Sequence, residues 1–300
     1  MSYNKIKTDL QVALAKWLAR RSLRTMMRIG RVLGRLFYFL PNSRKRVAKI
    51  NLDICFPESS DQEAKALLKN NLISTGQGVM EMLAALWSPD QHVVGQFKVT
   101  GMSHLQQALD GGKGCLLLSC HTTSIEWGIR GLNHHMKSAG LPVGHMLARQ
   151  HNNKLLEAHF EAARLGFVEK LIDKKNLRSL LKSINTGSPV YYAPDQNFSY
   201  QVAFADFFGR PAATTLGTLK LAQKGVSIIP WFCFRTADCQ WHIEILPPLS
   251  NFAELNESQA SDYINQLFEA QIRNHPAQYL WVHRRFKNQP EGYDNPYRSD

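Results

Sequence analysis

His121 and Glu126 are the residues whose types and spacing are best suited to chemistry. They belong to a short segment with the sequence Leu117-Leu118-Ser119-Cys120-His121-Thr122-Thr123-Ser124-Ile125-Glu126. The apolar run at 114–120 predicts a buried strand that ends at His121, and Glu126 then lies just over one turn into the following helix. A carboxylate there can hold the imidazole in one tautomer and leave its other nitrogen to accept a proton from an alcohol. A His-x4-Glu spacing is common among unrelated residues, so its position at a strand end is what favours catalysis.

The residues around this pair add two expectations. Free backbone amides near Thr122 to Ser124, at the start of the helix, carry a positive field that could help to hold an oxyanion. Cys120 precedes His121, but neighbouring residues on a strand point to opposite faces. Cys120 is therefore expected to pack in the core rather than to act as a nucleophile with His121.

Strands and helices alternate through the central part of the chain. A helix is predicted over 62–86, with Ser59, Ser60 and Asp61 as candidate caps. Apolar runs predict strands at 114–120, 142–148, 188–193, 226–234 and 241–246. Further helices are expected at 123–136, 152–165, 175–185, 212–223 and 258–274. This alternation predicts an α/β fold with a mixed, largely parallel central sheet flanked by helices.

The positive charge is concentrated at the N-terminus. Residues 1–50 contain 13 Lys and Arg and one acid, Asp9, whereas residues 51–300 contain 23 of each sign. A basic arm on a neutral domain is typical of a protein that docks on a surface. We therefore expect a membrane-docking arm at 1–50 and a catalytic domain at 51–300. The arm is not expected to span a membrane, because no stretch of the chain without Lys, Arg, Asp or Glu exceeds twelve residues.

The arm has the pattern of an amphipathic helix. One face carries Arg21, Arg24, Arg28, Arg31 and Arg35, and the opposite face carries Leu23, Met26, Gly30, Leu33 and Phe37. With Phe39 near its end, such a helix could lie in the interface of an anionic membrane. The alternative is a helix whose apolar face packs on the protein's own core.

The cysteines and glycines exclude other classes of site. The five cysteines form no C-x-x-C pair, which argues against zinc and disulfides and favours reduced, mostly buried thiols in the cytoplasm. The Gly-rich segment at 111–114 lacks the Ser or Thr of a phosphate loop. Neither a metal nor a redox cofactor is implied.

Several blocks along nearly the whole chain resemble one family. They are Leu33-Gly34-Arg35-Leu36, Arg46 to Glu58, His121 to Glu126, Tyr192-Ala193-Pro194-Asp195-Gln196, Phe207 to Gly217, Ile229-Pro230-Trp231 and Gln278 to Phe286. In this order they resemble the late acyltransferases of lipid A biosynthesis, within the lysophospholipid acyltransferase superfamily. The chain departs from many relatives in lacking a convincing N-terminal spanning helix, which makes a peripheral or monotopic location at the cytoplasmic face of the bacterial inner membrane the expectation.

The resemblance implies an activity and further site residues. The activity is transfer of a fatty acyl group from acyl carrier protein to a hydroxyl of a phosphorylated glycolipid, a lipid A precursor, with His121 as general base and Glu126 as its orienter. Arg149, Arg164 and Asp195 match positions that contact substrate. Two alternatives stay open: an acyltransferase for another phospholipid or glycolipid, and a non-enzymatic nucleic-acid-binding protein that uses the basic arm.

Overall fold

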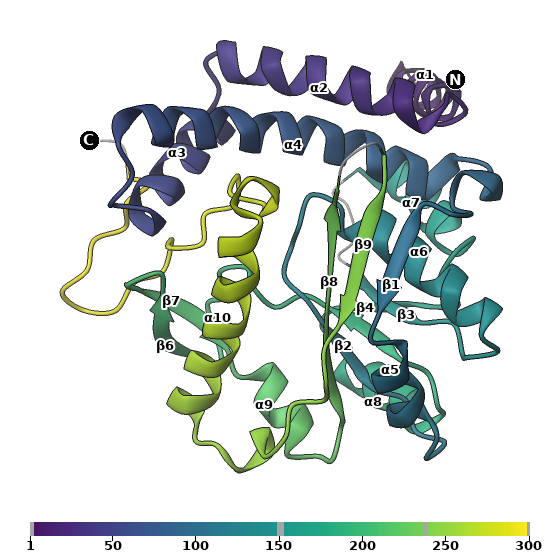
Figure 1. Cartoon of the computed structure of the whole chain (residues 1–300), viewed down its shortest axis with the longest axis vertical. Coiled ribbons are helices and arrows are strands. Elements are labelled where there is room, and N and C mark those ends of the chain that lie inside the picture. Colours follow the sequence, from purple (N-terminus) through teal and green to yellow (C-terminus); the bar gives the residue numbers. More distant parts are fainter. Residues whose placement is uncertain (1–2, 149–152, 237–238, 299–300) are drawn as a thin grey trace.

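A seven-stranded sheet forms the centre of the computed structural model, which describes residues 3–148, 153–236 and 239–298 (Figure 1). Its strands, in spatial order, are β1 (Phe97–Thr100), β9 (Trp241–Ile245), β8 (Ile228–Arg235), β2 (Leu116–Leu118), β5 (Val190–Tyr192), β3 (His145–Ala148) and β4 (Leu171–Asp173). The five strands from β8 to β4 are parallel, and β9 pairs antiparallel with β8. The predicted fold class, a mixed and largely parallel sheet, is confirmed.

A separate hairpin occupies part of a segment that we expected to be helical. β6 (Val202–Phe207) and β7 (Arg210–Thr215) pair antiparallel around Phe208 and Gly209. The helix predicted at 212–223 is therefore wrong in its first part, because residues 212–215 form cross-strand pairs with β6. The helix begins only at Gly217.

Helices cover both faces of the sheet and one of its ends. Their bounds are α1 Tyr3–Ala19, α2 Leu23–Phe39, α3 Ser43–Cys55, α4 Asp61–Trp87, α5 Met102–Leu109, α6 Ile125–Ser138, α7 Lys154–Arg164, α8 Leu177–Asn185, α9 Gly217–Ala222 and α10 Glu257–Asn274. Ser60 caps α4 in a reciprocal box with Glu63, as predicted, which stabilises the first turn. α3 runs across the expected domain boundary at residue 50.

Two clusters of apolar side chains, one on each face of the sheet, form the core. Leu116 and Leu118 of β2 face the cluster that includes α8, α9 and α10, whereas Leu117 faces the cluster that includes α6 and α4. This alternation is the period of a strand that is buried on both faces. β2 is therefore held rigidly, and so is the turn that follows it.

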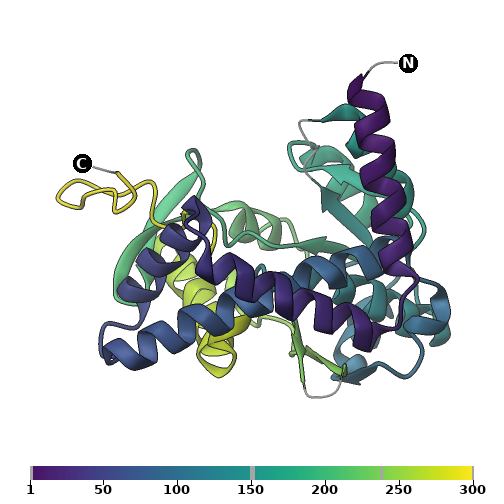
Figure 2. The same ribbon diagram turned by 90° about the horizontal axis from the view of Figure 1, so that it is seen from above.

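α4 lies across the end of the sheet, and α2 runs along its outer side (Figures 1 and 2). The two helices approach so closely that a Cβ added at Gly76 would lie 2.3 Å from the backbone oxygen of Gly30. Leu23 and Met26 are buried in this contact. The part of the apolar face that carries Leu23, Met26 and Gly30 thus packs on the protein itself, whereas Phe37 of the same face is exposed.

Part of the arm nevertheless presents apolar side chains to solvent. Val32, Leu36, Phe37, Phe39 and Leu40 of the α2 segment are exposed, and α1 exposes Ile6, Leu10, Leu14 and Trp17. In α1 these residues follow one another at steps of four, four and three, which places them on one face of the helix. Among the described residues, no helix is both long and apolar enough to cross a membrane.

Candidate active site

His121 and Asp195 meet at the carboxyl ends of two adjacent parallel strands. β2 and β5 pair in a register that sets Leu118 opposite Tyr192. Each of the two residues lies three positions beyond the last residue of its strand, His121 after Leu118 and Asp195 after Tyr192. The carboxyl ends of parallel strands are where α/β folds gather their chemistry, because the side chains there converge at one edge of the sheet.

Asp195 binds His121 with both of its carboxylate oxygens. Asp195 Oδ1 lies 2.5 Å from His121 Nδ1, and Oδ2 accepts the backbone N–H of His121 at 2.9 Å. Asp195 is 3% exposed, whereas the imidazole keeps 28% of its surface. The histidine is thus tied at Nδ1, and among the described residues none is hydrogen-bonded to Nε2.

The buried carboxylate also changes the proton affinity of the imidazole. Burial by itself lowers the pKa of His121, but the charge of Asp195 and its hydrogen bond outweigh burial and raise that pKa above its ordinary value. Burial would raise the pKa of Asp195, but the interactions with His121 and a hydrogen bond from Tyr279 lower it to about 2. Asp195 is therefore an anion at neutral pH, as a group that stabilises an imidazolium must be.

The C-terminal segment closes the site from one side. Leu280 N–H donates to the backbone oxygen of His121 at 2.9 Å, and Tyr279 pairs with Thr122 in a short antiparallel bridge. His283 follows this bridge in the chain. Burial is the main cause that lowers its pKa to about 4, and the neighbouring cations act in the same direction. His283 is therefore neutral, and its Nε2 accepts the backbone N–H of Asn197 at 3.2 Å.

Glu126 lies in the first turn of α6 but is paired with Arg164. Arg164 Nε donates to Glu126 Oε1 at 2.6 Å and Nη2 donates to Oε2 at 3.3 Å. The predicted contact between His121 and Glu126 is therefore not made in this structure, because α7 supplies the cation for Glu126 and the turn after β5 supplies the carboxylate for His121. Arg164, expected to bind substrate, uses two donors within the protein.

Two further expectations about the turn can be checked. The amides of Thr122 and Thr123 are not free, since they donate to the backbone oxygens of Cys120 and Gln278. The oxyanion role predicted for these two amides is therefore wrong in this structure. Cys120 is fully buried in the core, as predicted, and burial raises the pKa of its thiol, which opposes formation of a thiolate nucleophile.

Comparison with known proteins decides the family. The family model described as bacterial lipid A biosynthesis acyltransferase matches residues 5–288. The chain belongs to this family. It is 31% identical to the lipid A biosynthesis lauroyltransferase of Escherichia coli K12 over 274 residues, 90% of this chain and 88% of that protein. It is also 31% identical to the palmitoleoyltransferase of the same strain over 90% of this chain and 87% of that protein, and 25% identical to its myristoyltransferase over 91% and 83%.

Membership confirms the predicted class of enzyme. The chain is an O-acyltransferase, and the non-enzymatic nucleic-acid-binding alternative is excluded. In this acyltransferase the described residues contain no group of three or more His, Cys, Asp or Glu arranged to hold a metal ion.

The remaining predicted site residues differ in their outcome. Arg149 lies outside the described residues. Asp195, expected to contact substrate, is buried against His121 instead, and both of its oxygens are occupied there. The residues proposed for membrane docking are all exposed: Arg21, Arg24, Arg28, Arg31, Arg35, Phe37 and Phe39.

Sequence reasoning missed the partner of His121 and the apolar face of α1. The pairing of His121 with Asp195 has a signal in the sequence, because each residue follows the end of a predicted buried strand. The apolar face of α1 is visible in the sequence as the helical spacing of Ile6, Leu10, Leu14 and Trp17.

Proposed function

We propose that this acyltransferase moves a fatty acyl group from acyl carrier protein to a hydroxyl of a lipid A precursor, with His121 as the general base. The observation that carries the mechanism is the contact of Asp195 with Nδ1 of His121, which leaves Nε2 to work as the base. The names of the relatives, lauroyl-, palmitoleoyl- and myristoyltransferase, support an acyl donor and a lipid A acceptor.

The proposed reaction needs one base and no covalent enzyme intermediate. His121 Nε2 takes the proton of the acceptor hydroxyl while its oxygen bonds to the thioester carbonyl carbon. The tetrahedral intermediate then breaks its carbon–sulfur bond, and the imidazolium returns the proton to the departing thiolate. Asp195 stabilises the imidazolium in between and keeps the proton of Nδ1 in place.

Glu126 belongs to the proposed site as a second carboxylate. Arg164 holds it with an ion pair in which both side chains are only 13% exposed. The orienting role predicted for Glu126 would require it to exchange Arg164 for His121, and Asp195 already occupies Nδ1 in this structure. We therefore propose Asp195 as the orienter and Glu126 with Arg164 as a positioning pair at the start of α6.

The arm serves to hold the enzyme on the cytoplasmic face of the inner membrane in this proposal. Its exposed apolar residues on α1 and its arginines on α2 provide the two terms that an interfacial helix uses, burial of apolar area and attraction to anionic lipid. We thus propose that the arm docks the enzyme and that the remaining domain carries out catalysis.

The proposal is tested with the purified full-length protein, acyl carrier proteins charged with C12 to C16 chains, and a lipid A precursor that lacks secondary acyl groups. Mass spectrometry should show one added acyl chain per transfer with the wild type and with Cys120→Ala, whereas His121→Ala should transfer roughly 10³- to 10⁴-fold more slowly. Absence of transfer from every donor, or an acyl group trapped on Cys120, would overturn it.

A further inference from the structure

A polar pocket of about 470 Å³ lies between α2, α4 and the end of β8. Arg24, Arg28 and Arg31 of α2 line one wall, and Arg235, at the end of β8, lines another. Among the described residues that line the pocket, none is acidic. The three arginines of α2 are exposed, so their charges remain available to a ligand that enters from solvent.

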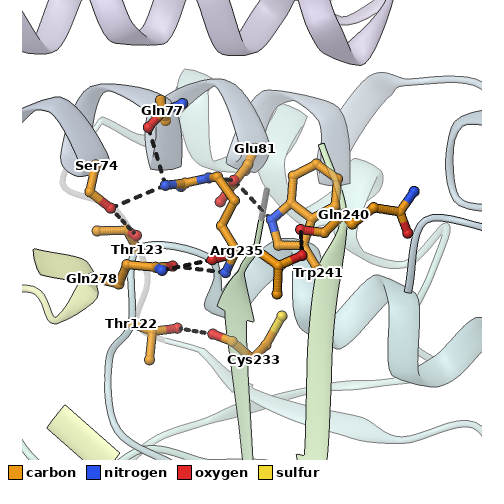
Figure 3. Close-up of polar contacts among 11 residues, drawn as sticks. Ser74, Gln77, Glu81, Thr122, Thr123, Cys233, Arg235, Gln240, Trp241 and Gln278 are labelled. Carbon is orange, nitrogen blue, oxygen red and sulfur yellow. Dashed lines mark hydrogen bonds and ion pairs between the residues drawn. The ribbon is translucent and has the colours of Figure 1, made fainter. Parts of the chain in front are cut away.

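Arg235, one of the residues that line this pocket, is held by several polar contacts (Figure 3). Its side chain is only 9% exposed, and its Nε donates to Glu81, which is 1% exposed. Its Nη1 donates to Ser74 Oγ at 3.2 Å and to Gln77 Oε1 at 3.3 Å. These contacts hold the guanidinium in one orientation, so no ordering of this side chain is needed when a ligand binds.

One donor group of Arg235 is left without a partner. Its Nη2 is buried and makes no hydrogen bond to any described residue. A buried charged donor without an acceptor is costly, and native proteins keep few of them without a reason. Oε2 of Glu81 is likewise buried without a partner among the described residues. Because Nη2 has no exposed surface, an anion in the pocket would stabilise the charge of this guanidinium rather than bind Nη2 directly. A phosphate fits the exposed arginines of α2 best, because a guanidinium with free donors presents them in a planar fork that matches two phosphate oxygens.

The charges around the pocket favour an anion even with Glu81 present. Glu81 offsets the charge of Arg235, and its Oε1 also accepts from the indole of Trp241 at 2.9 Å. Arg24, Arg28 and Arg31 then add three positive charges, and none of the described residues that line the pocket offsets them with an acidic side chain.

The surroundings of the pocket indicate that the phosphate belongs to a lipid. Val32, Leu36 and Phe39 lie farther along the same helix with their apolar side chains exposed to solvent. A free phosphate would not use such neighbours, whereas a lipid could place its headgroup between the arginines and its acyl chains along the apolar residues.

The back wall of the pocket is shared with the catalytic turn. Ser74 Oγ lies 2.9 Å from Thr123 Oγ1, and the Thr123 amide donates to the Gln278 backbone oxygen at 2.7 Å. Gln278 and Arg235 are joined by two hydrogen bonds of 2.8 Å. Thr123 is two residues from His121, so residues that line the pocket are linked by hydrogen bonds to the turn that carries the base.

We propose that the pocket is a binding site for the phosphate group of a lipid, formed by Arg24, Arg28 and Arg31 together with Arg235. The phosphate has two sources, a phospholipid of the surrounding membrane or the acceptor itself. The second source rests on the function proposed above, whereas the first does not.

Two double variants with the same change of net charge test the site. Arg28→Gln/Arg31→Gln removes two arginines of the pocket, and Arg21→Gln/Arg35→Gln removes two exposed arginines that do not line it, Arg35 of α2 and Arg21 just before that helix. Binding of the full-length protein is measured on phosphatidylcholine vesicles that contain phosphatidate, a phosphate monoester, or phosphatidylglycerol at equal surface charge. The KM for the acceptor with and without its phosphates is measured in parallel.

The pocket variant should bind phosphatidate vesicles on the order of tenfold more weakly than the control variant, or should raise the KM for the phosphorylated acceptor by a similar factor. The first result assigns the site to a membrane phospholipid and needs no enzymatic activity, and the second assigns it to the acceptor. If both variants weaken vesicle binding equally and neither changes the preference for a phosphorylated acceptor, the arginines act only through the general charge of α2 and the proposal is overturned.

Discussion

Replacing Asp195 by asparagine should nearly abolish transfer by reversing the tautomer of His121. In the wild type, Oδ2 of Asp195 accepts the backbone N–H of His121 at 2.9 Å, and Oδ1 faces Nδ1 at 2.5 Å. Asparagine has one oxygen, which the backbone N–H must use, so its NH2 group then faces Nδ1. Nδ1 has to accept, the ring proton moves to Nε2, and the nitrogen that should act as base no longer has a lone pair.

The size of this effect follows from two losses, the correct tautomer of His121 and the anion that stabilises its imidazolium. A base in the wrong tautomer, without an anion to stabilise its imidazolium, is expected to lose roughly 10³- to 10⁴-fold in kcat. This corresponds to about 4 to 5.5 kcal/mol in the activation free energy. An asparagine side chain has nearly the shape of the aspartate that it replaces, so the core around it should remain intact and the near-ultraviolet circular dichroism spectrum should be unchanged.

The assay is steady-state transfer, with Glu126→Gln as the matched control. Both variants change a carboxylate to an amide, but only Asp195 contacts His121 in the structure. The double variant His121→Ala/Asp195→Asn should be no slower than His121→Ala, because the two residues act as one unit. If Asp195→Asn kept activity within threefold of the wild type while Glu126→Gln lost a thousandfold, our assignment of the orienting carboxylate would be refuted.

Three further outcomes are expected. Because Asp195 raises the pKa of His121 and the base must be neutral, kcat/KM of the wild type should fall on the acid side through a pKa above 6.5, and Asp195→Asn should move this limb to lower pH in a pH–rate profile. Gly76→Ala should lower the unfolding free energy by about 1 to 3 kcal/mol because its Cβ meets the backbone of α2, whereas Gly111→Ala, with nothing within 4 Å, should leave the melting temperature unchanged. Leu14→Ser on the exposed face of α1 should weaken sedimentation with anionic vesicles on the order of tenfold without changing the melting temperature, and equal binding would remove α1 from the docking surface.

The sequence by itself determined the fold class and the family, and it singled out His121 as the proposed base. Buried strands are visible as apolar runs: β2 and β5 lie within runs that were predicted from the sequence alone, and β8 extends one residue beyond the run predicted at 226–234. The cap of α4 was visible because the capping pattern is local. His121 could be singled out because a strand end is a local feature too, readable from the residues before it.

Only the tertiary structure decided which partners these residues have. Asp195 lies 74 positions from His121 in the chain, and their contact depends on β2 and β5 being neighbours in the sheet, which no local pattern encodes. Glu126 was closer in sequence, yet α7 brings Arg164 to it. The apolar face of α2 had two possible uses, membrane or core, and the contact of Gly30 with α4 places Leu23 and Met26 in the core while Phe37 stays exposed. Side-chain types and their periodicity can be read directly from the sequence, whereas the pairing of distant segments depends on how the entire chain packs.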